Sequence, residues 1–120
     1  MKKISPTQRT IALLKKRGYT TAITEHWNAF AGIRQDLFGI IDVIGIHPEK
    51  FGVLGVQTTS KANAMARLKK AQKNKHLLVW YKSGNNFEIH GWGKDKKTGK
   101  WSTEIIEVVD KKYLPKTPRV

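Results

Sequence analysis

The chain has 120 residues, 39% of them hydrophobic, and carries a formal net charge of +14 at pH 7. This length suits a single domain with one core, and the hydrophobic content excludes a disordered chain. A charge this far from neutral favours an acidic polymer as partner. Nucleic acid fits better than a membrane, because no basic helix with a large apolar face is evident. Cysteine is absent, which excludes disulfides and thiolate metal sites and favours a cytoplasmic location.

The first third of the sequence predicts one helix and one strand. Ser5-Pro6 is typical of a helix start, and the helix is expected to run to about Arg17 and stop at Gly18. We expect neither a signal peptide nor a membrane span, since no apolar run opens the sequence. Residues 19–27 alternate in polarity and predict a strand, and residues 28–35 predict a loop.

Two apolar stretches follow, and they organise the rest of the sequence. Residues 38–46 and 53–58 are apolar on both alternation faces, which predicts two strands buried on both sides. Residues 47–50 contain Pro and polar residues that suit the connecting loop.

Two polar residues, Asp42 and Gln57, interrupt these apolar strands. One register of the hairpin sets them opposite each other, with Thr59 next along on the face of Gln57. A carboxylate inside a buried strand is costly unless a cation or hydrogen bonds compensate it. The pair therefore marks a candidate site.

The second half predicts another helix and three more strands. The expected elements are a helix over residues 61–73 capped by Ser60, a strand over 76–82, and a hairpin of residues 87–93 and 101–109 around the basic loop 94–100. Residues 111–120 contain two prolines and predict a loosely held basic tail. The order α-β-β-β-α-β-β-β predicts a mixed α/β domain.

This order, with Asp42 and Gln57 at these positions, resembles the PD-(D/E)XK nuclease superfamily, and in particular archaeal Holliday-junction resolvases and small phage nucleases. Residues 34–42 resemble the family's first acidic segment and residues 55–60 its acid-x-Lys segment. The resemblance implies a restriction-endonuclease-like core, α-β-β-β-α-β with a mixed sheet, to which this chain adds a β-hairpin. It covers roughly residues 5–82.

The resemblance implies a magnesium or manganese site and assigns roles to particular residues. Asp42, Gln57, the main-chain carbonyl of Thr58 and Glu25 would hold the metal. Gln57 stands where the family has an acid, and Thr59 where it has a lysine. Lys61, two residues further on, would supply the missing amine from the start of the helix. The catalytic set implied is therefore Asp42, Gln57, Thr59 and Lys61.

Each of these residues also has a structural explanation. Asp42 could be satisfied by main-chain N–H groups, and Gln57 could be a hydrogen-bonded core amide. Glu25 could face solvent on its strand, and Asp36 could be a turn former or a further ligand. Lys61 could be an ordinary charge on a helix surface.

The expected function is metal-dependent endonucleolytic cleavage of duplex or branched DNA, with recognition of shape rather than sequence. The side chains expected to hold the phosphate backbone are Arg34, Arg67, Lys69, Lys70, Lys96 and Lys97. A homodimer would agree with the resemblance, because resolvases pair two sites. Two alternatives stay open, a non-catalytic nucleic-acid-binding module with a degenerate nuclease core and an RNA-binding accessory protein.

Overall fold

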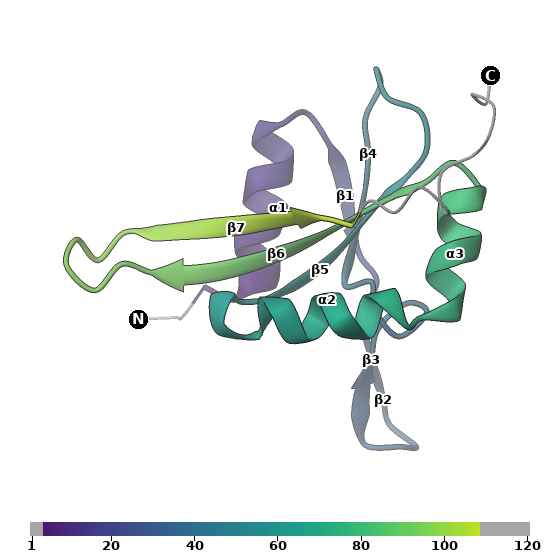
Figure 1. Ribbon diagram of the computed structural model, residues 1–120, viewed down its shortest axis with the longest axis horizontal. Coiled ribbons are helices and arrows are strands. Elements are labelled where there is room, and N and C mark those ends of the chain that lie inside the picture. Colours follow the sequence, from purple (N-terminus) through teal and green to yellow (C-terminus); the bar gives the residue numbers. More distant parts are fainter. Residues whose placement is uncertain (1–3, 109–120) are drawn as a thin grey trace.

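A computed structural model describes residues 4–108 of the chain, so the predicted tail over residues 111–120 lies outside the described residues (Figure 1). Five strands form one mixed sheet in the order β1-β4-β5-β6-β7, and β2 and β3 form a separate hairpin. Only β5 and β6 run parallel, and the other neighbours are antiparallel. The elements are α1 (Pro6–Lys16), β1 (Thr20–Ile23), β2 (His26–Asn28), β3 (Ile33–Gln35), β4 (Val43–Ile46), β5 (Leu54–Ser60), the 3-10 turn η1 (Lys61–Asn63), α2 (Ala64–Gln72), α3 (Lys75–Lys82), β6 (Asn86–Lys94) and β7 (Trp101–Glu107).

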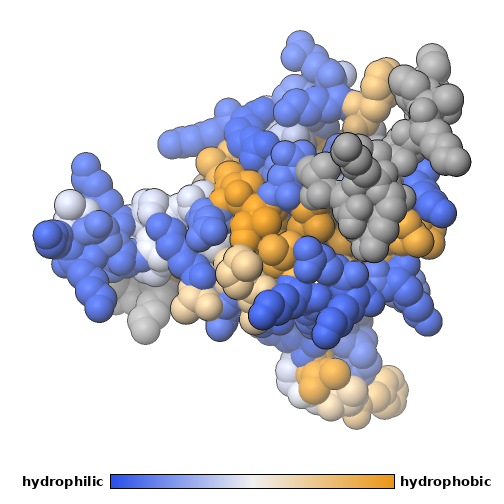
Figure 2. All heavy atoms as spheres, in the orientation of Figure 1, coloured by the Kyte–Doolittle hydropathy of each residue, from blue (hydrophilic) through white to orange (hydrophobic). Residues whose placement is uncertain are grey.

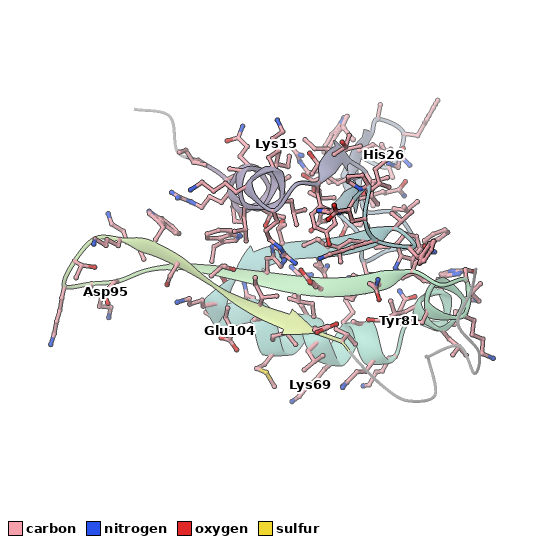
Figure 3. The ribbon with its side chains drawn as sticks, turned by 90° about the horizontal axis from the view of Figure 1, so that it is seen from above. Lys15, His26, Lys69, Tyr81, Asp95 and Glu104 are labelled. Atoms are coloured by element: carbon pink, nitrogen blue, oxygen red, sulfur yellow. The ribbon has the colours of Figure 1, made fainter. Side chains whose placement is uncertain are left out.

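Helices cover both faces of the sheet, as Figure 3 shows, with α1 on one side and α2 and α3 on the other. Leu14 of α1 packs with Val43, Leu54 and Val56 in the smaller core cluster. The larger cluster lies on the α2–α3 side and includes Ile40, Ile41, Ala64, Ala71, Leu77, Tyr81, Phe87 and Ile89. A central sheet covered on both faces explains why its strands are apolar on both alternation sets. The mixed α/β class predicted from the sequence is confirmed.

The first helix forms as the sequence predicts. The Ser5 hydroxyl accepts a hydrogen bond from the main-chain N–H of Gln8, and the Gln8 side chain accepts one from the N–H of Ser5. Gly18 follows the last turn with a φ of 90°, a left-handed conformation that favours glycine.

The single strand predicted over residues 19–27 is wrong, because the chain leaves the main sheet near residue 24. The main-chain N–H groups of Thr24 and Glu25 both donate to the carbonyl oxygen of Asp42, at 2.8 and 3.3 Å. The chain then enters β2 and returns through β3. Residues 28–35, predicted as a loop, therefore contain the turn and return strand of a hairpin.

The strand predicted over residues 38–46 begins later than expected, at Val43. Phe38 and Gly39 have φ values of 54° and 79°, and a bridge between Leu37 and Ile41 closes a turn around them. The antiparallel pairing of β4 with β5 is observed from Val43, which pairs with Val56. Asp42 lies just before this ladder and its N–H donates to the carbonyl of Val56 at 2.9 Å, so the predicted opposition of Asp42 and Gln57 is not part of the observed pairing.

The strand predicted over residues 76–82 is wrong, since this segment is helix α3. In a strand, Leu77, Val79 and Tyr81 would share one face, yet Leu77 and Tyr81 are buried whereas Val79 is 61% exposed. The four-residue spacing of the two buried side chains is that of a helix. Asn74 begins the helix by accepting hydrogen bonds from the N–H groups of His76 and Leu77.

The strand parallel to β5 is instead β6, the first strand of the C-terminal hairpin. That hairpin is observed close to its predicted bounds, with β7 ending at Glu107. The helix predicted over 61–73 is also confirmed, although it opens with η1 and Ser60 makes no side-chain cap. Within residues 4–108, every helix is too short or too polar to cross a membrane.

Replacing the cap of α3 tests its helical assignment. Asn74→Ala removes both cap hydrogen bonds and the bond from Asn74 Nδ2 to the carbonyl of Phe38, 3.0 Å away. We expect the free energy of unfolding to fall by about 1–2 kcal/mol, measured by urea denaturation. Lys73→Ala, at an exposed neighbouring position, is the control and should change it by less than about 0.5 kcal/mol. Equal stability of the two variants would contradict the assignment.

Candidate metal centre

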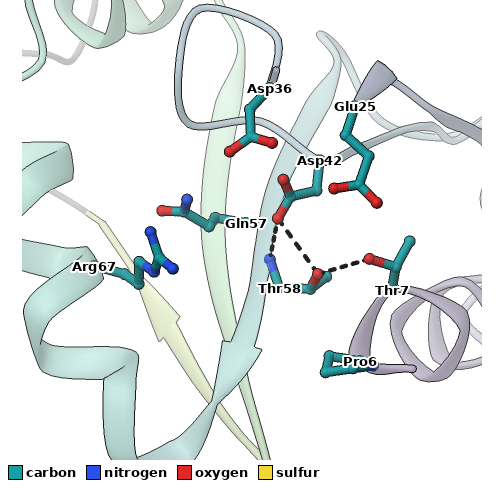
Figure 4. A pocket seen from close by; sticks show the side chains of 8 residues that line it. All are labelled: Pro6, Thr7, Glu25, Asp36, Asp42, Gln57, Thr58 and Arg67. Carbon is teal, nitrogen blue, oxygen red and sulfur yellow. Dashed lines mark hydrogen bonds between the residues drawn. The ribbon is translucent and has the colours of Figure 1, made fainter. Parts of the chain in front are cut away.

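A polar hollow opens where β5 continues past the start of β4. Its volume is about 230 Å³, and the residues that line it all come from the first 67 residues of the sequence (Figure 4). They are Pro6, Thr7, Glu25, Asp36, Asp42, Gln57, Thr58 and Arg67.

Three carboxylates meet in this hollow. Each of Glu25, Asp36 and Asp42 offers an oxygen, and these oxygens lie within 4.8 Å of one another. Glu25 directly precedes β2, Asp36 directly follows β3, and Asp42 directly precedes β4. The β2–β3 hairpin therefore departs from and returns to the acidic cluster.

Asp42 is buried and firmly oriented, with 5% of its surface exposed. Its Oδ2 accepts hydrogen bonds from the main-chain N–H of Thr58 at 2.8 Å and from the Thr58 hydroxyl at 3.3 Å. The hydroxyls of Thr58 and Thr7 are 3.0 Å apart. Because the single hydroxyl proton of Thr58 points to Asp42, Thr7 is the donor of that bond. The first turn of α1 thus supports the carboxylate through Thr58.

Burial and neighbouring carboxylates raise the pKa of Asp42 from 3.8 to about 7. Burial contributes most, followed by the side-chain interaction with Asp36, while the N–H of Thr58 acts in the opposite direction. The charges of Asp36 and Glu25 add to the rise. A proton or a cation in the hollow relieves this repulsion.

Gln57 lines the same hollow, and its Oε1 lies on the side of Arg67 (Figure 4). The residue is 2% exposed, and its Oε1 atom is buried without a hydrogen-bond partner among the described residues. An unmade bond of this kind costs about 1–3 kcal/mol. The Gln57 amide therefore lacks the partner that the core-amide explanation requires for its oxygen.

The donor set fits a hard divalent cation. Three carboxylates and an amide carbonyl are the oxygen ligands that Mg²⁺ and Mn²⁺ accept. The cation would balance the carboxylate charge that raises the pKa of Asp42. The residues that line the hollow therefore fit the metal that the sequence predicts.

Two arginines accompany the carboxylates. Arg67 reaches from α2 toward Gln57, across the hollow from the acidic cluster (Figure 4). Arg34 of β3 lies at the rim, where its Nη1 forms an ion pair with Glu25 at 3.3 Å. A neighbouring hollow shares Asp36 and includes Arg34 and Lys70. Positive side chains thus border the site on two sides.

The structure does not bring Lys61 to the hollow. The Lys61 ammonium donates to the Ser102 hydroxyl at 2.7 Å, toward β7. Its aliphatic part lies over Gly93, where a Cβ atom would come within 2.8 Å of Lys61 Cδ. Thr59 is buried and does not line the hollow. Among the residues that line the hollow, Arg67 is the cation that stands where Lys61 was expected.

The remaining predicted phosphate contacts are spread widely. Lys69 and Lys70 are exposed on α2, and Lys70 lies nearest the site. Lys96 and Lys97 lie in the loop between β6 and β7, at the far end of the hairpin from α3 (Figure 1). Asp95 shapes that loop by accepting hydrogen bonds from the N–H groups of Lys97 and Thr98.

The sequence predicted Asp42, Gln57, Thr58 and Glu25 at one site, and the structure brings all four to the same hollow. It adds Asp36, which the sequence left open between turn former and ligand. Thr7 was missed, because its link to Asp42 runs through a residue 51 positions away. Comparison with protein-family models, curated proteins and solved structures finds no match to this chain.

The raised pKa of Asp42 predicts a specific dependence of stability on pH. The folded protein retains a proton that the unfolded chain releases above about pH 4, so stability is lost as pH rises through about 7. The asparagine of the Asp42→Asn variant cannot ionise, so this variant should not lose stability as the pH rises. In EDTA, we expect Asp42→Asn to be more stable than wild type by roughly 1–4 kcal/mol at about pH 8 and nearly equal to it at about pH 4.

Urea denaturation at both pH values measures this difference. Asp95→Asn is the control, because main-chain hydrogen bonds from Thr98 and Lys97 hold the pKa of that exposed carboxyl below its usual value. It should show no gain at high pH. A similar gain in both variants would show that general charge, and not the acidic cluster, is responsible.

Proposed function

We propose that this protein is a metal-dependent DNA endonuclease that hydrolyses phosphodiester bonds and recognises the shape of the duplex or branch. One observation carries the proposal. Three carboxylates lie within 4.8 Å of one another, in a hollow that Gln57 also lines. Arg67 lines the same hollow, and the chain has a net charge of +14.

The topology supports a restriction-endonuclease-like core. Without the β2–β3 hairpin and α3, the order of elements is α1, β1, β4, β5, α2, β6, and the first three strands are successively antiparallel. The last strand pairs parallel with β5. Asp42 lies at the start of the second of these strands and Gln57 on the third, as the resemblance to PD-(D/E)XK nucleases implies. The chain departs from the pattern of that superfamily in having α3 and in the position of Lys61.

The residues that would hold Mg²⁺ or Mn²⁺ are Asp42, Asp36 and Glu25, with the carbonyl of Gln57. When bound, such an ion polarises a phosphoryl oxygen and lowers the pKa of a water molecule. Gln57 brings no charge where the family has an acid, and Asp36 and Glu25 compensate for this by giving the cluster three carboxylates. The Thr58 hydroxyl and N–H hold Asp42 in one orientation.

The basic residues of the site position the nucleic acid. Arg67 can hold a phosphate group through two parallel hydrogen bonds and stabilise charge that develops on it. Arg34 and Lys70 border the adjacent hollow and can hold neighbouring phosphates. Such contacts carry no sequence information, which agrees with recognition by shape.

Cleavage assays on linear duplex, single-stranded and four-way branched DNA test the activity. We expect wild type to nick at least one of these with Mg²⁺ or Mn²⁺ and not with EDTA. Asp42→Asn should lower the rate by about 100-fold or more, since it removes a charged ligand that no other side chain replaces. Asp95→Asn should cleave like wild type. Unchanged cleavage by Asp42→Asn would refute the site.

The two candidate cations predict different outcomes. Because Arg67 lines the hollow and Lys61 bonds to Ser102, Arg67→Ala should lower the cleavage rate by about 100-fold, and Lys61→Ala by less than about threefold. Single-turnover rates at saturating protein measure this without interference from weakened binding. The opposite order would show that Lys61 swings to the site on binding DNA.

A non-catalytic nucleic-acid-binding module is the second candidate, favoured by the position of Lys61 and Thr59 outside the hollow. It predicts metal-independent binding and no cleavage of any of the three substrates. If about six phosphates are neutralised, the logarithm of the binding constant falls with the logarithm of salt concentration at a slope of roughly −5. Cleavage that requires a divalent metal ion and Asp42 excludes this candidate.

A further inference from the structure

The β2–β3 hairpin, residues 26–35, projects from the body of the molecule as a short finger (Figure 1). Its large apolar side chains face solvent, with Trp27 62%, Phe30 106% and Ile33 51% exposed. Figure 2 shows hydrophobic residues gathered at its end, apart from the apolar surface of the main body. Clustered apolar side chains of this kind on a surface mark an interaction site.

The tip of the finger is ordered before any partner binds. Asn28 Oδ1 accepts hydrogen bonds from the main-chain N–H groups of Phe30 and Ala31, at 3.0 and 3.1 Å. The N–H of Gly32 donates to the carbonyl of Asn28 at 2.8 Å, and Gly32 has a φ of 66°. The turn therefore holds its backbone in one conformation with the Phe30 ring outward, so ordering costs little on binding.

One face of the finger is continuous with the metal centre. Trp27 and Arg34 are cross-strand partners and share that face. Arg34 in turn forms its ion pair with Glu25 of the acidic cluster. Arg34 and Trp27 thus stand side by side, each two residues beyond a carboxylate of the cluster, and Phe30 lies beyond them in the turn.

The charge of the finger decides which partner it fits. Residues 26–35 contain no acidic side chain, and Arg34 and Lys70 flank its base. A second copy would bring another chain of net charge +14 against it, which opposes association. Nucleic acid offers phosphates for the guanidinium and flat apolar bases for the rings, and aromatic side chains stack on bases without regard to sequence.

We propose that the β2–β3 finger recognises a discontinuity in DNA, such as a branch point or bulge, by stacking Phe30 and Trp27 on bases that have lost a neighbour. The inference rests on the proposed function, since it assigns the substrate class of that site. Apolar side chains wedge between base steps at low cost where the stack is already broken. In an intact duplex, the aromatic rings could stack only after two paired bases had been unstacked, which costs free energy. The finger therefore binds DNA with a branch point or bulge more tightly than intact duplex.

The geometry also predicts where the cut falls. Strand β2 carries the chain from Glu25 to Asn28, about 10 Å at about 3.3 Å per residue, and Phe30 lies in the turn beyond it, so its ring lies roughly 10–15 Å from the carboxylates. Stacked DNA advances about 3.4 Å per nucleotide along one strand. Cleavage should therefore fall about three to five nucleotides from the branch or bulge.

Binding in EDTA tests the finger without catalysis. The probes are a duplex with a two-nucleotide bulge and the matched intact duplex, each carrying 2-aminopurine at the bulge or the equivalent position. We expect wild type to bind the bulged duplex about tenfold or more tightly than the intact one and to change the fluorescence of its 2-aminopurine. Phe30→Ala should lose both the preference and the fluorescence change while keeping its affinity for intact duplex.

Phe51→Ala is the matched control, because Phe51 is 80% exposed in the loop between β4 and β5, on the opposite side of the molecule from the finger (Figure 1). It should behave like wild type. Circular dichroism confirms that each variant is folded, as expected for exposed positions. A preference for the bulge that survives Phe30→Ala overturns the inference, and so does an equal loss in Phe51→Ala.

Two further outcomes separate this inference from the proposed function. Wild type that dimerises through Phe30 in sedimentation, with Phe30→Ala monomeric, assigns the finger to a second copy and overturns the inference. Cleavage that requires Asp42 but falls at random on bulged and intact duplexes supports the nuclease and overturns the finger. A Phe30-dependent preference for the bulge without cleavage supports the finger and overturns the nuclease. Absence of any DNA binding overturns both.

Discussion

Repulsion among Asp42, Asp36 and Glu25 is the constraint around which this structure is arranged. Their oxygens lie within 4.8 Å of one another, and burial of Asp42 reduces the screening that water would provide. Like charges at this separation persist only when a proton or a cation neutralises part of them. The fold keeps these three carboxylates together despite the cost of their repulsion, although the chain as a whole is strongly positive. A metal ion would neutralise the local negative charge of the carboxylates, and the positive surface would attract a polyanion to the same place.

The surrounding elements position these carboxylates rigidly. The sheet fixes Asp42 through main-chain bonds on both sides, from Thr24 and Glu25 to its carbonyl and from its own N–H to Val56. Thr58 fixes the carboxylate itself, and Thr7 of α1 fixes Thr58. Both helical layers therefore reach the site, since Arg67 comes from α2 on the other face. A change in the packing of either helical layer would therefore shift the positions of the carboxylates.

The β2–β3 finger gives the site a second level of organisation. Glu25 and Asp36 stand at the two ends of the finger. A molecule that binds the finger would therefore affect the positions of two of the three carboxylates. The Arg34–Glu25 ion pair spans the junction and offers a guanidinium that can exchange its carboxylate for a phosphate. The proposed recognition and the proposed chemistry would thus share one continuous segment of 12 residues, from Glu25 to Asp36.

Local sequence was sufficient for several features. Ser5-Pro6 and Gly18 delimit α1 through capping and backbone conformation, which depend on near neighbours alone. The apolar stretches around residues 43–46 and 54–58 and the loop between them form the antiparallel pair β4–β5, which brings Asp42 and Gln57 to one hollow. The basic charge and the absence of cysteine follow from composition.

Tertiary structure decided the rest, because the deciding contacts join distant residues. Residues 76–82 are rich in strand-forming side chains, yet packing of Leu77 and Tyr81 on the sheet makes them helical. Thr24 is still bonded to the carbonyl of Asp42, and beyond it the chain leaves the main sheet and forms the finger, which brings Glu25 and Asp36 together. Lys61 was expected at the site from its place in the sequence, but the path of β6 and β7 binds it to Ser102 and leaves Arg67 facing the hollow.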